Sequence, residues 1–176
     1  MIITSVLGLE ANAIYAAANK IPTIYNLAYT TFNMAWQESA TIEKKSEDVE
    51  IYYSKMFNHL FKFLLGMMLL LVAVSPFLFK ILLDESYNDA FYQMPILFIG
   101  LFFYSFSNFY GGIFVALKET KKIASSSVIA AVINIVINLM LIQNIGIYAG
   151  SISTLVAYIV VAILRARGVQ KHYKID

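Results

Sequence analysis

An apolar run, FLLGMMLLLVAV at residues 63–74, most constrains what this chain can fold into. A bilayer core about 30 Å thick is crossed by a helix of about 20 mostly apolar residues. Stretches of that length occur at residues 12–36, 57–83, 91–117, 123–142 and 147–164. The sequence therefore predicts an all-α fold, a polytopic transmembrane bundle of about five helices.

Composition supports a membrane protein. The 176 residues are 60% hydrophobic and 14% charged, whereas soluble domains are about 45–50% apolar and about 25% charged. A soluble chain of this length needs polar residues to cover its outside, but a lipid-facing bundle exposes apolar side chains.

The charges predict an orientation, because Lys and Arg collect on the cytoplasmic side of membrane proteins. Residues 84–90 carry Asp84, Glu85 and Asp89 without a basic residue, and residues 143–146 carry no charge. Ten of the thirteen basic residues follow the first, third and fifth stretches: Lys44, Lys45, Lys55, Lys118, Lys121, Lys122, Arg165, Arg167, Lys171 and Lys174.

This alternation predicts three parts for the chain. Residues 1–10 are the extracytoplasmic end of a preceding helix or loop, residues 11–165 are the bundle, and residues 166–176 are a basic cytoplasmic tail. Residues 37–55 mix charges of both signs with apolar positions, which is typical of a solvated linker or a surface helix.

The first stretch carries a polar ribbon on one helical face, because its polar residues recur three, four or seven positions apart. Several unsatisfied amides facing lipid would cost several kcal/mol each, so the ribbon must face other helices or a water-filled path. We favour a cavity wall over simple bonding between helices. The ribbon comprises Asn12, Asn19, Thr23, Asn26, Thr30, Asn33 and Gln37.

Lys20 lies beside the ribbon and has two interpretations. A charge deep in a membrane costs about 2.5–3.5 kcal/mol on insertion scales, so an intramembrane lysine marks a functional candidate. If the helix begins nearer Ala17, the side chain instead reaches the outer headgroups on its aliphatic stem.

Other polar and small residues suggest helix packing. Asn134 and Asn138 lie one turn apart and either bond a neighbouring helix or line a cavity. Gly146, Gly150 and Thr154 form a stripe that admits a close helix. Pro76 predicts a bend in the second stretch.

No enzyme chemistry is indicated. The chain has no cysteine and only two histidines, His59 and His172, far apart in sequence. We therefore expect no catalytic residue, no metal site, no cofactor and no nucleic-acid partner.

Four segments together resemble one protein family. NAIYAAANKIPTIYNLAYTTFNMAWQESA, DESYNDAFYQMPILFIG, ALKETKK and VINIVINLMLIQNIGIYAGSISTLVAY follow one another in the family's order. The chain is similar to polysaccharide and oligosaccharide flippases of the multidrug/oligosaccharidyl-lipid/polysaccharide exporter superfamily. Lys20 matches a frequent basic position of that pattern, and Asn134 with Asn138 match its recurrent Asn pair.

The resemblance implies a function and a site. Family members have twelve or more helices in two lobes around a cavity, and this chain resembles the last five. It implies alternating-access flipping of polyprenyl-diphosphate-linked oligosaccharide across the bacterial cytoplasmic membrane, with an amino-terminal lobe from the same or another chain, membrane lipids around it and a cytoplasmic carboxyl terminus. A fragment of a cation-coupled multidrug exporter and a non-transport scaffold are the alternatives. The candidate cavity-lining residues are Asn19, Lys20, Thr23, Asn26, Thr30, Asn33, Asn134 and Asn138.

Overall fold

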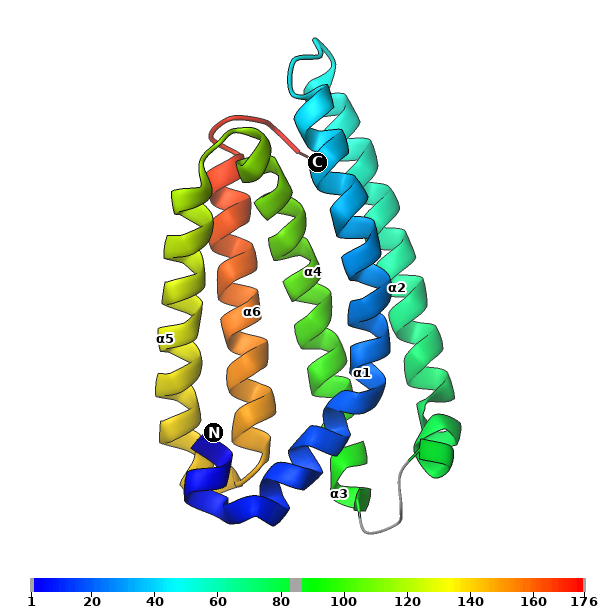
Figure 1. Cartoon of the computed structure of the whole chain (residues 1–176), viewed down its shortest axis with the longest axis vertical. Coiled ribbons are helices and arrows are strands. Elements are labelled where there is room, and N and C mark those ends of the chain that lie inside the picture. Colours follow the sequence, from blue (N-terminus) through cyan, green and yellow to red (C-terminus); the bar gives the residue numbers. More distant parts are fainter. Residues whose placement is uncertain (1, 83–86, 176) are drawn as a thin grey trace.

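The structure is a bundle of long helices (Figure 1). The computed structural model describes residues 2–82 and 87–175, and every regular element within them is helical. The predicted all-α fold is therefore confirmed. The helices are α1 (Ile2–Glu43), α2 (Val49–Leu82), the short α3 (Asn88–Phe91), α4 (Met94–Ala116), α5 (Thr120–Ile145) and α6 (Tyr148–Val169).

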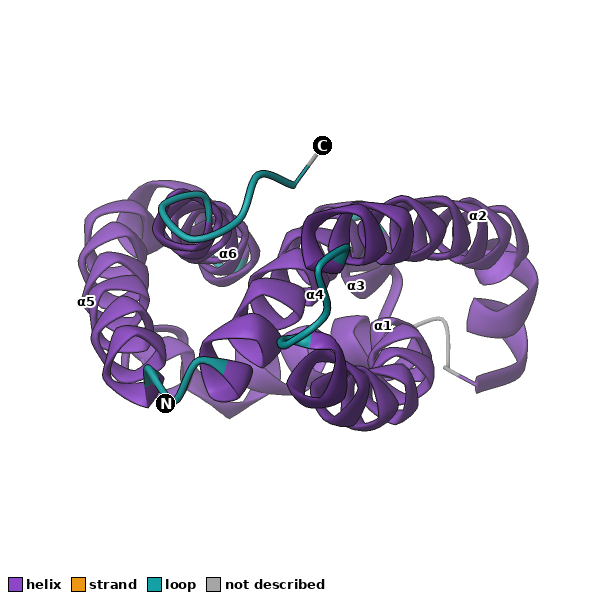
Figure 2. Cartoon of the chain, turned by 90° about the horizontal axis from the view of Figure 1, so that it is seen from above, coloured by secondary structure: helices purple, strands orange, loops and turns teal. Residues whose placement is uncertain are grey.

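Helix α4 lies at the centre of the bundle (Figure 2). It packs against α6 on one side and α1 on the other. Helix α5 packs mainly on α6, and α2 lies against α1 and α4. The bundle thus has an α5–α6 side and an α1–α2 side that meet on α4.

Four segments are long and apolar enough to cross a membrane: Val49–Ile81, Asn88–Ala116, Thr120–Ile145 and Tyr148–Val169. They overlap the second to fifth stretches predicted from the sequence. Helix α1 is not one of the four, because its ribbon lowers its hydropathy. Its predicted span of 25 residues, 12–36, would still rise about 37 Å, and α1 lies alongside α2 and α4 (Figure 1). A crossing by α1 stays a prediction.

Of the two alternatives for residues 37–55, a linker is wrong for most of the segment, which is helical. Helix α1 continues to Glu43 and α2 begins at Val49, which leaves only residues 44–48 between them. Apolar contacts cause the extension, because Ala40, Val49 and Tyr53 are buried. The Tyr53 hydroxyl also donates a hydrogen bond to the Ala40 carbonyl oxygen at 2.7 Å.

Three glycines and one proline occupy positions that can bend, end or closely pack a helix. Gly8 has a φ of 90°, a left-handed conformation that separates residues 2–7 from the rest of α1. Gly146, with a φ of 58°, is the turn between α5 and α6, so it is not part of the predicted α6 stripe. Gly150 does admit a close helix, because an added Cβ would lie 2.9 Å from Ile3 Cδ1. Pro76 lies inside α2, where a bend stays a prediction.

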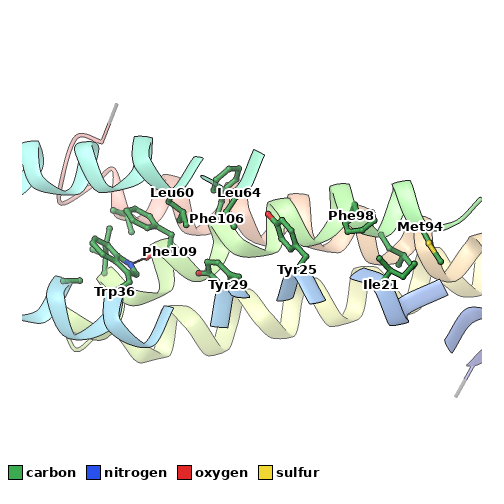
Figure 3. Packing of buried hydrophobic residues seen from close by; sticks show 14 of the residues in the cluster. Ile21, Tyr25, Tyr29, Trp36, Leu60, Leu64, Met94, Phe98, Phe106 and Phe109 are labelled. Carbon is green, nitrogen blue, oxygen red and sulfur yellow. Dashed lines mark hydrogen bonds between the residues drawn. The ribbon is translucent and has the colours of Figure 1, made fainter. Parts of the chain in front are cut away.

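Trp36 anchors α1 on α4 (Figure 3). Its indole stacks on the Phe109 ring with centroids 4.3 Å apart. The indole Nε1 donates a hydrogen bond to the Phe109 carbonyl oxygen at 2.8 Å. Gly112 leaves room for this contact, because a Cβ there would lie 2.6 Å from Nε1. Further along the same interface, Tyr25 packs edge-on against Phe98.

The basic segments gather at one end of the bundle. The α1–α2 connection, the α4–α5 connection and the carboxyl terminus lie at that end, and the α5–α6 turn and α3 lie at the other (Figure 1).

At the basic end, the Lys122 Nζ forms a salt bridge with the Glu119 carboxylate at 2.7 Å. This contact, together with nearby His172, holds the pKa of the Glu119 carboxyl below its usual range. The Glu119 contribution to stability is therefore present at neutral pH and is lost only as pH falls through that lowered pKa. Asp84 and Glu85, expected at the opposite end, lie outside the described residues.

Gly112→Ala should destabilise the bundle. The added Cβ would meet both Nε1 and Cδ1 of Trp36 at less than 3 Å, and overpacking of this kind costs about 1–3 kcal/mol. The thermal unfolding midpoint in detergent should fall. Gly66→Ala is the matched control, because nothing lies within 4 Å of its Cβ position in α2 and alanine favours a helix. An equal fall in both variants would contradict the role assigned to the Trp36 contact.

Candidate functional site

A cavity of about 390 Å³ lies among α4, α5 and α6. Tyr104 of α4 and Tyr158 of α6 form an aromatic wall, with ring centroids 4.7 Å apart. Alanine, isoleucine and valine side chains make up half of the remaining lining residues. The polar lining residues are Ser107, Ser127, Asn134, Thr154 and Arg165.

A second cavity of about 190 Å³ lies where the start of α1 meets α5 and α6. Asn12 and Tyr15 of α1 line it, opposite Asn138 of α5. The Asn138 side chain is only 7% exposed, and its Oδ1 has no hydrogen-bond partner among the described residues. Asn138 therefore lines this cavity with an amide oxygen that is buried and unpartnered.

Asn134 and Thr154 line both cavities, so this pair lies between them. The Asn134 Nδ2 donates a hydrogen bond to the Thr154 hydroxyl at 3.2 Å. Asn134 thus does both things that the sequence left open, since it bonds a neighbouring helix and lines a cavity. Asn138 lines the smaller cavity, so the predicted pair on α5 comes together at one site.

Arg165 lies buried at one end of the larger cavity and is 5% exposed. Its Nε donates to Ser126 Oγ at 3.0 Å and its Nη2 to Ser127 Oγ at 2.9 Å, both on α5. Its Nη1 donates to the Ser107 carbonyl oxygen at 3.1 Å, on α4. Because Arg165 itself belongs to α6, one side chain ties three helices together.

The Arg165 charge is solvated by neutral oxygens. Within residues 2–82 and 87–175 the guanidinium makes no ion pair, and Asn108 Oδ1 and the Ile123 carbonyl oxygen complete its hydrogen bonds at 3.3 Å and 3.5 Å. A Cβ at Gly111 would lie 3.2 Å from Nη1, so glycine keeps this space open. A buried guanidinium whose N–H groups are all hydrogen-bonded avoids most of the desolvation free energy that a buried charge without partners would cost.

The sequence interpretation missed this role. It counted Arg165 among the basic residues that follow the last span, whereas α6 continues to Val169 and encloses it. The available signal was the set of polar residues facing it from two other stretches, Ser107 with Asn108 and Ser126 with Ser127. Linear sequence does not show that these positions meet one cation.

The α1 ribbon lies apart from these cavities. Asn19, Asn26 and Asn33 are half-buried at the edge of the face that packs on α4, and Thr23 and Thr30 are exposed. Only Asn12 of the ribbon lines either cavity. The structure therefore separates the ribbon from the asparagine pair of α5.

Hydrogen bonds along the ribbon stay within α1. Asn19 Nδ2 donates to the Tyr15 carbonyl oxygen at 2.8 Å, and Thr23 Oγ1 donates to the Asn19 carbonyl oxygen at 2.7 Å. Asn33 Oδ1 accepts a hydrogen bond from the Tyr29 hydroxyl at 3.1 Å. Between Asn19 and Asn33 these side-chain hydrogen bonds of the ribbon therefore stay within α1, and the half-buried amides lie at the edge of the bundle.

Lys20 is exposed on the outside of α1 and lines neither cavity. It lies on the same helical face as Ile24 and Leu27, which are 43% and 63% exposed. A lysine in this position reaches an interface or a partner surface rather than the interior of the bundle.

The two cavities suit hydrogen bonding and the burial of apolar groups. No Asp or Glu lines either of them. Among the described residues, no group of three His, Cys, Asp or Glu side chains could hold a metal ion. Amide, hydroxyl and aromatic groups can exchange hydrogen bonds with hydroxyl-rich ligands and stack on apolar surfaces.

Comparison with known proteins identifies one relationship. The model of a family described as MatE matches residues 1–140, which contain α1 to α4 and most of α5. The match includes the ribbon, Asn134 and Asn138, and it ends before Thr154 and Arg165. No curated protein and no solved structure matches the chain significantly.

Arg165→Lys should lower stability although it keeps the charge. Lysine has no planar fork, so it cannot bond the oxygens of α4 and α5 together, and we expect a loss of about 2 kcal/mol or more. Thermal unfolding in detergent measures this loss. Arg167→Lys, at an exposed position of the same helix, should change stability by less than about 0.5 kcal/mol. An equal loss of stability in the two variants would contradict the role assigned to Arg165 in joining the three helices.

Proposed function

The chain belongs to the MatE family, and we propose that it forms the carboxyl-terminal part of a flippase for polyprenyl-diphosphate-linked oligosaccharide. Proteins of this family are membrane transporters, not enzymes, and they include the polysaccharide flippases. The protein is accordingly a multi-pass membrane protein. The cargo and the alternating-access route are the proposed part.

The exposed polar ribbon of α1 carries the proposal. Asn26, Thr30 and Asn33 follow one edge of a helix that lies beside apolar membrane spans, and they open to the outside of the bundle. The Thr30 hydroxyl donates to the Leu27 carbonyl oxygen at 2.8 Å, and Asn33 Oδ1 accepts from Tyr29. Hydrocarbon cannot supply the further hydrogen bonds that the amide groups of Asn26 and Asn33 can make. Water, cargo or a second polar protein surface must therefore cover this edge.

A second lobe facing α1 would satisfy that requirement. The ribbon would then form one wall of a water-filled path, and the facing lobe would form the other. Amides and hydroxyls arranged along such a path can exchange hydrogen bonds with sugar hydroxyls as the cargo passes. We propose this amino-terminal lobe, in the same or another chain, as the principal protein partner.

The charge distribution favours an anionic or neutral cargo over an organic cation. No carboxylate lines either cavity, and Arg165 contributes a positive charge to the larger one. A cationic drug would meet this charge without a compensating acid on these helices. The multidrug alternative would therefore require the acidic groups of the facing lobe.

The gathering of basic residues at one end supports an orientation. The α1–α2 connection, the α4–α5 connection and the residues that follow α6 lie at one end of the bundle (Figure 1), and these segments contain Lys44, Lys45, Lys118 and Lys171. By the positive-inside rule this end faces the cytoplasm. We propose the bacterial cytoplasmic membrane as the location.

Cysteine labelling tests the water-filled path. The natural chain has no cysteine. In the single variants Asn26→Cys and Thr30→Cys, the introduced thiol is therefore the only one in this chain that can be labelled. In the complete transporter both should react with a membrane-impermeant maleimide, and excess cargo should slow the reaction.

Val132→Cys and Leu139→Cys are the controls, because these exposed apolar positions lie on α5. They should stay unlabelled in intact membranes. Unreactive cysteines at both ribbon positions would favour a scaffold in which the ribbon only joins helices.

Complementation tests the cargo. The complete transporter should restore surface polysaccharide in a flippase-deficient cell, whereas this chain expressed alone should not, because it supplies only one wall of the path. Full rescue by this chain alone would contradict the need for a second lobe. Export of organic cations without polysaccharide rescue would instead establish the drug-exporter alternative.

A further inference from the structure

A basic crevice of about 220 Å³ opens between α5 and α6 at the basic end of the bundle. Lys122 and Lys171 line it together with Arg165, and the hydroxyls of Ser125 and Ser126 contribute to the wall. No Asp or Glu is among its lining residues. We propose that this crevice binds the headgroup of an anionic phospholipid.

The charges in the crevice are poorly balanced by protein. Lys122 pairs with Glu119, but the structure shows no ion pair for Lys171 or Arg165 within the described ranges. Arg165 already uses its donors on protein oxygens, so it adds positive potential rather than new hydrogen bonds. Lys171 remains to contact a phosphate directly. Lys122 already contacts Glu119 and lies 3.2 Å from His172 Nε2, so of its three N–H donors it can offer one more hydrogen bond.

The position of the apolar residues favours a lipid over a free anion. Ile129 follows Lys122 by seven residues on α5, and Leu164 precedes Lys171 by seven residues. On α5, seven residues rise about 10 Å, so Ile129 lies about two turns from Lys122 along the helix. Lys171 lies just beyond Val169, the last residue of α6. Both apolar residues line the crevice and are 45% and 37% exposed. A phosphate at the lysines would therefore place acyl chains along exposed apolar surface.

Packing keeps the crevice open. Phe114 forms part of its wall, and Lys122 Nζ lies 5.3 Å from the centroid of that ring. A Cβ at Gly168 would lie 2.8 Å from Phe114 Cζ, so glycine allows the ring its place beside α6. Basic pockets between membrane helices on the cytoplasmic side are known to accept anionic lipid headgroups.

The test compares lipid compositions and charge variants. The full-length protein is placed in nanodiscs of phosphatidylcholine, with or without phosphatidylglycerol, and its thermal unfolding midpoint is measured. Native mass spectrometry of the detergent-solubilised protein counts retained phosphatidylglycerol. We expect phosphatidylglycerol to raise the midpoint and to be retained in preference to phosphatidylcholine.

Lys122→Gln and Lys171→Gln should each weaken phosphatidylglycerol retention about fivefold, and the double variant about thirtyfold. Lys121→Gln with Arg167→Gln removes the same charge at exposed positions that do not line the crevice. This control should retain the lipid as the natural protein does. The single variant Lys171→Gln leaves the ion pair between Lys122 and Glu119 intact. Weaker lipid retention by this variant would therefore not result from loss of that ion pair.

Three outcomes would overturn the proposal. The first is an equal loss of lipid in the control variant, which would indicate attraction to the whole basic surface. The second is the absence of any difference between the two nanodisc compositions. The third is full stabilisation by inorganic phosphate without lipid, which would assign the crevice to a free anion.

Discussion

Hydrocarbon offers no hydrogen bonds, and this constraint explains where the polar groups of the apolar helices lie. Arg165 is the strongest case, because it carries a full charge inside α6. Oxygens from α4 and α5 surround its guanidinium and replace water. The same contacts hold the three helices at a fixed spacing, with the larger cavity between them.

Helix α1 follows a different pattern. Its buried face uses Trp36, Tyr29 and Tyr25 to pack on α4, while the adjacent edge remains polar and open. A helix that combines an anchored aromatic face with an exposed amide edge is suited to a wall between protein and water. The chain belongs to a family of membrane transporters, and this relationship supports the proposal that the polar edge lines a transport path.

The two ends of the bundle have different chemistry. At one end, the start of α1 closes over Asn138 and the Asn134–Thr154 pair. At the other, Lys122, Lys171 and Arg165 line a crevice together with the apolar residues Phe114, Ile129 and Leu164. One end is thus suited to neutral hydrogen bonding and the other to an anionic membrane surface.

Much of the fold followed from local sequence. The four apolar stretches became α2, α4, α5 and α6, because about 20 apolar residues in a row have few stable alternatives to a membrane helix. The extension of α1 to Glu43 and the start of α2 at Val49 were not predicted, since Tyr53 and Ala40 are buried only when α1 and α2 lie side by side. Gly146 was similarly misassigned, because its left-handed φ is a property of the turn that joins α5 to α6.

The sequence by itself determined the membrane class, the polar edge of α1 and the one-turn spacing of Asn134 and Asn138. Periodicity fixes which residues share a face of a helix, and length fixes which helices can cross a bilayer. Only the tertiary structure decided which faces meet. It placed Arg165 among serines of two other helices, joined Asn134 to Thr154 and left every ribbon residue except Asn12 outside the two cavities. Those outcomes depend on contacts between residues far apart in the chain, which no local pattern specifies.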